Sequence, residues 1–273
     1  ESVVMRLLDQ SAGLLTLEQT GMPPDILARF RQQLQRPHGM ILVTGPTGSG
    51  KTTTLYGALS ELNLPGSKII TVEDPIEFVH QSQSCVVNHR EVGVHTKTFS
   101  SALRGALRED PDIILVGELR DLETISLAVE AASTGHLVFG TLHTTSAPKT
   151  VDRIIEVFPS SEQAQIRSTL ADGLRAVIAQ VLFKRVDIKG RCAALEILIA
   201  TSAVRNLIRE AKTFQIPSMM QTGKKYGMQL LDDAIMDYVS KGWISPDEAY
   251  NKANDKAKFR PLLKSPPSDF TEA

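Results

Sequence analysis

Eight consecutive residues have the types and spacing that bind phosphate groups. They are Gly45, Pro46, Thr47, Gly48, Ser49, Gly50, Lys51 and Thr52, which match the pattern Gly-x-x-x-x-Gly-Lys-Ser/Thr. Glycines let successive backbone N–H groups turn toward an anion, and the positive end of a helix dipole strengthens the attraction. Lys51 is expected to reach the β- and γ-phosphates, and the hydroxyl of Thr52 to ligate Mg²⁺, with Thr53 completing the predicted set. A chance glycine-rich turn is the alternative, at a frequency on the order of one per cent. The sequence therefore predicts a site for a nucleoside triphosphate.

Two carboxylates and one histidine are candidates for the chemistry on that triphosphate. Glu118 follows the apolar run 113–117, and Glu73 closes the run 69–72. Parallel strands deliver functional residues at their carboxyl ends, where a carboxylate can orient or deprotonate the attacking water. Each could instead be a solvated acid at a strand end. His143 ends another apolar run and could contact the γ-phosphate, but a lone histidine is as often structural.

The elements that must position these residues alternate between strand and helix patterns. Strands are predicted at residues 40–44, 68–73, 86–92, 112–119 and 137–142. Helices are predicted at residues 52–62, 99–109 and 122–133. Such alternation favours an α/β fold with a largely parallel sheet covered by helices.

The pattern changes after about residue 144. Ser160, Ser161, Glu162 and Gln163 resemble a capping box, which predicts a helix running towards Lys184. One more strand is expected at 194–200, and helices from residue 202 onward, including 228–243. Ser245 and Pro246 predict the cap and first turn of a last helix. The tail after Leu263 is expected to be disordered.

Composition narrows the class of protein. The 273 residues include 30 Lys and Arg against 31 Asp and Glu, a formal charge of −1 that argues against a protein gripping nucleic acid by its phosphates. No apolar run is long enough to cross a bilayer, so we expect no direct membrane insertion. Two cysteines without a CxxC pair predict neither a zinc site nor a disulfide framework. Arg90, Arg104, Arg108 and Arg120 are scattered, and none is assigned as an arginine finger.

Together these motifs resemble the secretion ATPases of type IV pili and type II secretion. The glycine loop is followed by an aspartate box at residues 71–77, a Walker B region at 110–121 and a histidine box at 135–144. The glycine before Glu118 is normal in that family. The resemblance implies a RecA-like P-loop NTPase core with a helical C-terminal segment, ATP and Mg²⁺ as ligands, and catalytic roles for Glu118, Glu73 and His143.

Within the family, the C-terminal half is most similar to the PilT-like pilus retraction ATPases. Residues 203–210 resemble the AIRNLIRE motif of that group, and they also form an amphipathic helix pattern with Val204, Leu207 and Ile208 inward. The resemblance implies a cytoplasmic homohexamer, peripheral at the inner-membrane face, that acts on an inner-membrane platform protein. Residues 2–8 and 36–39 look more like the assembly and secretion branch, so that branch is the alternative. A nucleotide-dependent switch or scaffold is another.

The expected organisation has four parts. Residues 1–36 are expected to be an N-terminal linker and helix remaining from an upstream domain, and 37–200 the RecA-like ATPase core. Residues 201–263 are expected to be a helical C-terminal domain, and 264–273 a disordered tail.

Overall fold

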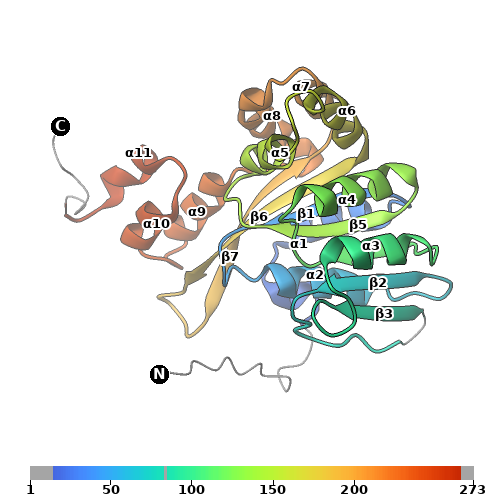
Figure 1. Cartoon of the computed structure of the whole chain (residues 1–273). Coiled ribbons are helices and arrows are strands. Elements are labelled where there is room, and N and C mark those ends of the chain that lie inside the picture. The colour runs from blue at the N-terminus through green and yellow to red at the C-terminus, as the bar shows by residue number, and fades with distance from the viewer. Residues whose placement is uncertain (1–14, 83–84, 266–273) are drawn as a thin grey trace, which may run out of the picture.

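A computed structural model describes residues 15–82 and 85–265, and its centre is a seven-stranded sheet (Figure 1). The strand order is β3-β2-β4-β5-β1-β6-β7; all neighbouring pairs are parallel except β6 with β7. The strands are β1 (Gly39–Thr44), β2 (Lys68–Glu73), β3 (Val86–Glu91), β4 (Ile113–Val116), β5 (Leu137–Leu142), β6 (Leu174–Lys184) and β7 (Arg191–Ile199). This confirms the predicted α/β class with a largely parallel sheet.

Helices cover both faces of the sheet. One hydrophobic cluster joins the sheet to α3–α8, and a second joins its other face to α1 and α2. The α-helices are α1 (Pro24–Leu34), α2 (Lys51–Leu62), α3 (Phe99–Leu107), α4 (Leu122–Thr134), α5 (Ala147–Glu156), α6 (Gln163–Gly173), α7 (Ser202–Arg209), α8 (Ile216–Thr222), α9 (Leu231–Ser240), α10 (Pro246–Lys252) and α11 (Lys256–Phe259). Short 3₁₀ turns are η1 (Glu18–Thr20), η2 (Thr213–Gln215), η3 (Gly223–Tyr226) and η4 (Arg260–Leu262).

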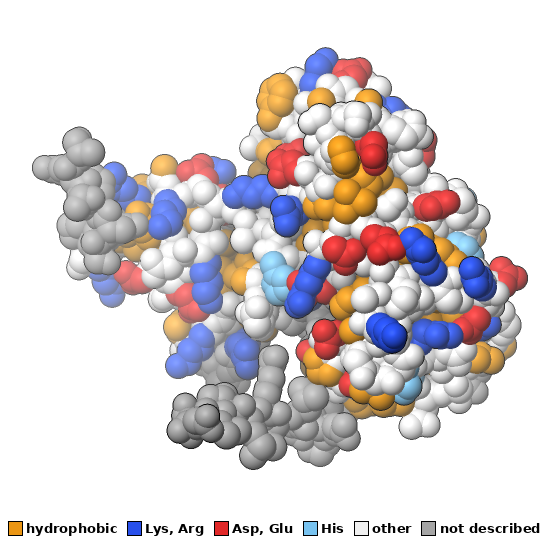
Figure 2. All heavy atoms as spheres, in the orientation of Figure 1, with side chains coloured by type: hydrophobic (Ala, Val, Ile, Leu, Met, Phe, Trp, Pro, Cys, Tyr) orange, Lys and Arg blue, Asp and Glu red, His pale blue; other side chains and the backbone are white. Residues whose placement is uncertain are grey.

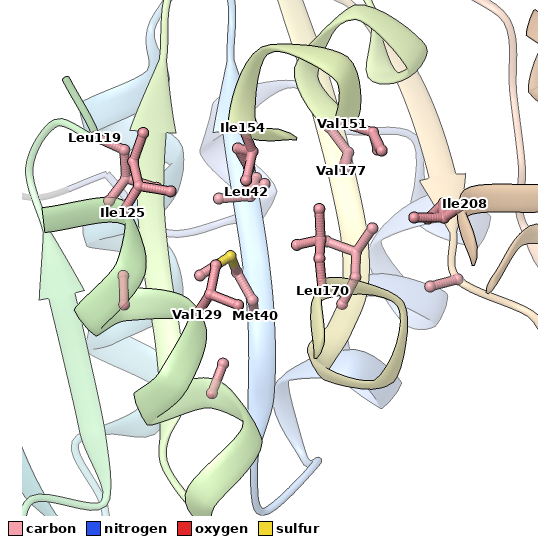
Figure 3. Packing of buried hydrophobic residues seen from close by; sticks show 14 of the residues in the cluster. Met40, Leu42, Leu119, Ile125, Val129, Val151, Ile154, Leu170, Val177 and Ile208 are labelled. Atoms are coloured by element: carbon pink, nitrogen blue, oxygen red, sulfur yellow. The ribbon is translucent and has the colours of Figure 1, made fainter. Parts of the chain in front are cut away.

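Strand β1, which lies between β5 and β6, is apolar almost without interruption because of where it lies in the sheet. Side chains alternate between the two faces of a strand, and here both faces are covered. Met40 and Leu42 belong to one cluster, while Ile41 and Val43 belong to the other. In Figure 3, Met40 and Leu42 lie among side chains from α4, α5 and α6. Full burial of each such side chain stabilises the fold by about 1.5–3 kcal/mol.

Most predicted elements are confirmed with small changes at their ends, but one is wrong in its second half. The helix that begins near Ser160 ends at Gly173, and Leu174–Lys184 form β6. The predicted capping box is also wrong, because the residue before this helix is Glu162 and makes no side-chain cap bond. Residues 174–184 form a strand because they pair with β1 on one side and with β7 on the other. This sheet environment overrides the helix preference of their Leu, Ala and Gln residues.

The end of the described chain packs in two ways. Helices α7 and α8 contribute Val204, Ile208, Ile216 and Met220 to the same cluster as the sheet. Helices α9–α11 instead cover the far ends of β6 and β7, where Phe183, Ile235 and Phe259 form a third cluster. As predicted, the Ser245 hydroxyl caps α10 and Pro246 opens it. The four-part division of the chain stays a prediction, and residues 1–14 and 266–273 lie outside the described residues.

Candidate nucleotide site

The glycine loop joins the end of β1 to the start of α2, as predicted. Gly45, Gly48 and Gly50 have φ angles of 140°, 78° and 84°, a region that side-chain-bearing residues rarely adopt. At Gly45 there is a second reason for glycine, because a Cβ atom would lie 2.2 Å from the carbonyl oxygen of Gln180. The loop therefore has the backbone freedom and close packing that a phosphate cradle needs.

A buried glutamine on β6, which belongs to none of the sequence motifs, braces this loop. The side chain of Gln180, only 3% exposed, donates from Nε2 to the carbonyl of Ser49 at 2.6 Å. Its Oε1 accepts from the Thr54 hydroxyl at 2.8 Å. One side chain thus ties the loop to the first turn of α2. The sequence pattern predicts a helix that runs through residues 174–184, and a helix there gives Gln180 no defined position beside the loop.

Lys51 points back into the loop. Its ammonium group donates to the carbonyl of Gly45 and, at 3.3 Å, to that of Pro46, and it lies 3.4 Å from Nδ1 of His143. Burial lowers the pKa of Lys51, while the nearby Glu118 and Glu77 carboxylates oppose that shift. The positive charge is therefore held where a phosphate tail would enter the loop.

Glu118 and His143 face each other across the cleft. Nε2 of His143 lies 3.2 Å from Oε1 of Glu118, and Arg120 pairs with the other oxygen at 2.5 Å. Burial alone would raise the pKa of Glu118. The hydrogen bond and charge of Arg120, with His143 and Lys51, outweigh it, and the pKa lies below its usual value. Glu118 is consequently an ionised acceptor, and its basicity depends on the position of Arg120.

Glu73 lies deeper than the other candidates, at 4% exposure. The Tyr56 hydroxyl donates to Glu73 Oε2, whereas Oε1 is buried without a hydrogen-bond partner and lies 3.9 Å from Nδ1 of His89. Gly117, just after β4, allows the chain to pass close to Glu73 at the end of β2. A Cβ atom on residue 117 would lie 3.2 Å from the Cα of Glu73. The glycine before Glu118 is thus a packing requirement between the ends of β2 and β4.

Four neighbouring strands bring the sequence motifs together. The order β2-β4-β5-β1 places Glu73, Glu118, His143 and the glycine loop at one edge of the sheet. They line a cleft of about 560 Å³. Six residues of the loop (Thr47, Gly48, Ser49, Gly50, Lys51 and Thr52), together with Thr53, line it as well. The lining also includes polar residues for which the sequence predicts no role, among them Tyr56, Asp74, Glu77, Arg120 and Arg191.

The other scattered candidates lie elsewhere. Arg90 pairs with Glu109 and Arg104 with Glu123, on surfaces away from the cleft. His136 contacts the carbonyl oxygen of Pro111 through Nδ1 at 2.6 Å, which is a structural contact. None of these residues lines the cleft.

A divalent cation fits this site only together with phosphate. Within residues 15–82 and 85–265, no group of three or more His, Cys, Asp or Glu side chains could hold a metal ion. Mg²⁺ usually keeps several waters and binds through one or two protein groups plus substrate phosphates. Thr52 lies at the start of α2, partly exposed to the cleft, which suits that mode.

A strand, a glycine loop and a helix, with a carboxylate just beyond the carboxyl end of another strand of the same sheet, define the class of P-loop ATPases. The chain belongs to the family described as type II/IV secretion system protein, whose pattern matches residues 1–189. It is therefore a nucleotide-hydrolysing enzyme of the secretion and pilus ATPase group, as the sequence analysis predicted.

Two relatives and one solved structure show how close the similarity is. The type IV pilus retractation ATPase PilT of Pseudomonas aeruginosa is 56% identical over 247 residues, covering 90% of this chain and 70% of the relative. The twitching motility protein of Neisseria gonorrhoeae is 54% identical over 243 residues, covering 89% of this chain and 64% of the relative. The crystal structure of the pilus retraction motor PilT with bound ADP superposes with a TM-score of 0.82 at 43% identity, over 90% of this chain and 69% of that one.

Proposed function

We propose that this chain is the ATP-hydrolysing part of a motor that retracts type IV pili. The observation that carries the proposal is the meeting of Lys51, Glu118 and His143 in one cleft beside the glycine loop. The similarity to a pilus retractation ATPase over 90% of the chain supports the retraction direction. The chain spans 64–70% of the two relatives' length, so the activity of the whole protein is part of the proposal.

Each site residue has a proposed role that follows from its position. The loop amides and Lys51 hold the β- and γ-phosphates, and the ammonium group leaves its carbonyl contacts to do so. Glu118 accepts a hydrogen bond from the attacking water and orients it. His143, which lies between Lys51 and Glu118, contacts the γ-phosphate, and Glu73 supports the water-binding side of the cleft.

Mg²⁺, held by the Thr52 hydroxyl and the phosphates, would neutralise charge on the leaving phosphate oxygens. Thr52 can supply this ligand because it is the second residue of α2, directly after Lys51, and its side chain lines the cleft. The rest of the stabilisation comes from the loop amides and Lys51.

The motor proposal includes an assembly and a location. We propose a homohexamer that works against an inner-membrane platform protein from the cytoplasmic side, in which nucleotide turnover changes the packing between subunits. Among the described helices, none is long and apolar enough to span a membrane. Contact with the membrane machine would thus be made through the partner protein. Figure 2 shows acidic and basic side chains interspersed over the visible face, which does not favour a nucleic-acid partner.

The experiment is a Glu118→Gln substitution in the gene of the cells that produce the protein, with pili counted on the cell surface. A retraction motor without turnover leaves cells with more surface pili and no twitching motility. A pilus-assembly motor gives the opposite result, cells without pili, and a secretion ATPase leaves cargo inside the cell. Either of these last two results would overturn the proposal of a retraction motor, but not the assignment of the cleft as an ATPase site. Normal twitching with a turnover-deficient protein would indicate a nucleotide-dependent switch.

A further inference from the structure

A second cleft lies at the opposite edge of the sheet from the glycine loop. It has a volume of about 620 Å³ and lies between α1, the start of β6, α7 and η3. Its basic lining comprises Arg29, Arg36, His38, Arg175, Arg205 and Lys225, and none of the described residues that line it is acidic. In a chain with a formal charge of −1, this concentration of positive charge is local.

The positive groups are held close together although they repel one another. Burial lowers the pKa of Arg175, and the charges of Arg205 and Arg36 lower it further. Arg175 is fixed because Nε donates to the carbonyl of His38 at 3.0 Å and Nη1 to that of Asp172 at 2.9 Å. The fold thus keeps a guanidinium group in an unfavourable electrostatic position, which an anion would relieve.

Arg205 adds a donor that the described residues do not use. Its Nε atom is buried and has no hydrogen-bond partner among them, and Nη2 makes only a long contact of 3.5 Å to the carbonyl of Leu174. A buried unpaired donor on a charged group is costly, and phosphate oxygens are its natural acceptors. Ser202, at the first turn of α7, adds a hydroxyl to the same lining.

We propose that this cleft binds a soluble small molecule carrying two or more phosphate groups. Phosphate oxygens would bridge the partly buried Arg175 and Arg205, and the exposed Arg36 and Lys225 would close over them. The cavity is large enough for a ligand of nucleotide size rather than a single phosphate. The site is separate from the proposed pilus function and does not depend on it.

The position of the cleft gives the ligand a route to the nucleotide site. Arg175 lies near the start of β6, and Gln180, which braces the glycine loop, lies five residues further along the same strand. Arg175 also packs against the start of β1: a Cβ on Gly39 would lie 2.5 Å from its Cγ atom. A ligand that shifts Arg175 therefore acts on β1, which leads into the loop, and on β6, which carries Gln180.

The test is a calorimetric titration of the chain with inorganic tripolyphosphate, without Mg²⁺, in the Lys51→Ala background that weakens the glycine loop. The cleft variant carries Arg36→Gln and Lys225→Gln, two exposed residues whose side chains form no hydrogen bond within residues 15–82 and 85–265. The control variant carries Arg104→Gln and Lys241→Gln, which remove the same charge from other surfaces. Melting temperatures establish that both variants fold.

We expect one tripolyphosphate to bind per chain, at least tenfold more weakly in the cleft variant (about 1.4 kcal/mol) and within twofold of the parent in the control. Arg205→Lys, which keeps the charge but loses the planar donor fork, is expected to weaken binding as well. No binding at this cleft, or equal losses in the cleft and control variants, would overturn the proposal. Binding only to vesicles of phosphatidylglycerol, with the same dependence on Arg36 and Lys225, would also overturn it in favour of a lipid headgroup.

Discussion

Replacing Gln180 by Met tests whether the glycine loop is held in place from β6. Methionine has a similar volume, so the change removes hydrogen bonds without opening a large cavity. It leaves the Ser49 carbonyl and the Thr54 hydroxyl without their partners, and both contacts are buried. Each unsatisfied group costs about 1–3 kcal/mol, so for the two groups we expect a loss of about 2–6 kcal/mol in the free energy of unfolding.

We expect the folded Gln180→Met chain also to bind ADP more weakly, in addition to its loss of stability. The bond from Gln180 to Ser49 fixes a loop carbonyl, and its loss leaves the loop amides less well ordered for phosphate. We expect the Kd for ADP to rise about tenfold, equivalent to about 1.4 kcal/mol. Urea unfolding measures the first quantity, and calorimetric ADP titration of the folded chain measures the second.

The matched control is Thr54→Val. This change breaks only the bond from Thr54 to Oε1 of Gln180 and leaves the bond to Ser49 in place. It should lower the free energy of unfolding by about 1 kcal/mol and change ADP affinity by less than about threefold. If Gln180→Met leaves both quantities unchanged, or if the two variants weaken ADP binding equally, the bracing role of Gln180 is refuted.

Three further predictions follow from the site. Gly117→Ala should destabilise the chain by about 1–2 kcal/mol and lower turnover, because the new Cβ crowds the end of β2. The control Gly105→Ala in α3, whose Cβ would make an ordinary contact of 3.7 Å, should be neutral or stabilising. Denaturant unfolding and an ATPase assay compare the two variants, and equal effects would contradict the packing argument. His143→Ala should reduce turnover with little change in stability, since the His143 side chain is 49% exposed. His136→Ala should cost about 1 kcal/mol of stability and leave ADP affinity unchanged. The reverse pattern would contradict both assignments, with His143 as the structural residue and His136 as the functional one. Arg120→Gln removes the hydrogen bond and the charge that lower the pKa of Glu118, so the pKa of Glu118 should rise. Because the ionised form of Glu118 is the active one, the acidic limb of the pH–rate profile should move to higher pH. An acidic limb that does not move would contradict the role assigned to Glu118.

The sequence was sufficient for the parts of the molecule that depend on local pattern. The glycine loop needs particular residue types at fixed spacing, and strands β1, β2 and β5 each contain a short run of mainly apolar residues with clear ends. Their carboxyl ends bring Glu73, Glu118 and His143 to one edge because parallel strands share a direction.

The sequence does not predict the contacts between residues that are far apart along the chain. The strand Leu174–Lys184 resembles a helix locally and becomes a strand only because β1 and β7 lie on either side. With that strand misassigned, the bracing by Gln180 could not be foreseen. The pairing of Arg120 with Glu118 and of Tyr56 with Glu73 likewise depends on side-chain positions that no spacing rule fixes.

The central claim is that this cleft binds ATP through the glycine loop and hydrolyses it with the help of Glu118. The most direct measurement pairs nucleotide affinity with steady-state ATPase rate, in the presence of Mg²⁺, for the parent chain, Lys51→Ala and Glu118→Gln. The account predicts that Glu118→Gln retains its affinity while its rate falls by at least ~100-fold, and that Lys51→Ala loses affinity. Unimpaired hydrolysis by Glu118→Gln, or undiminished nucleotide binding by Lys51→Ala, would contradict it.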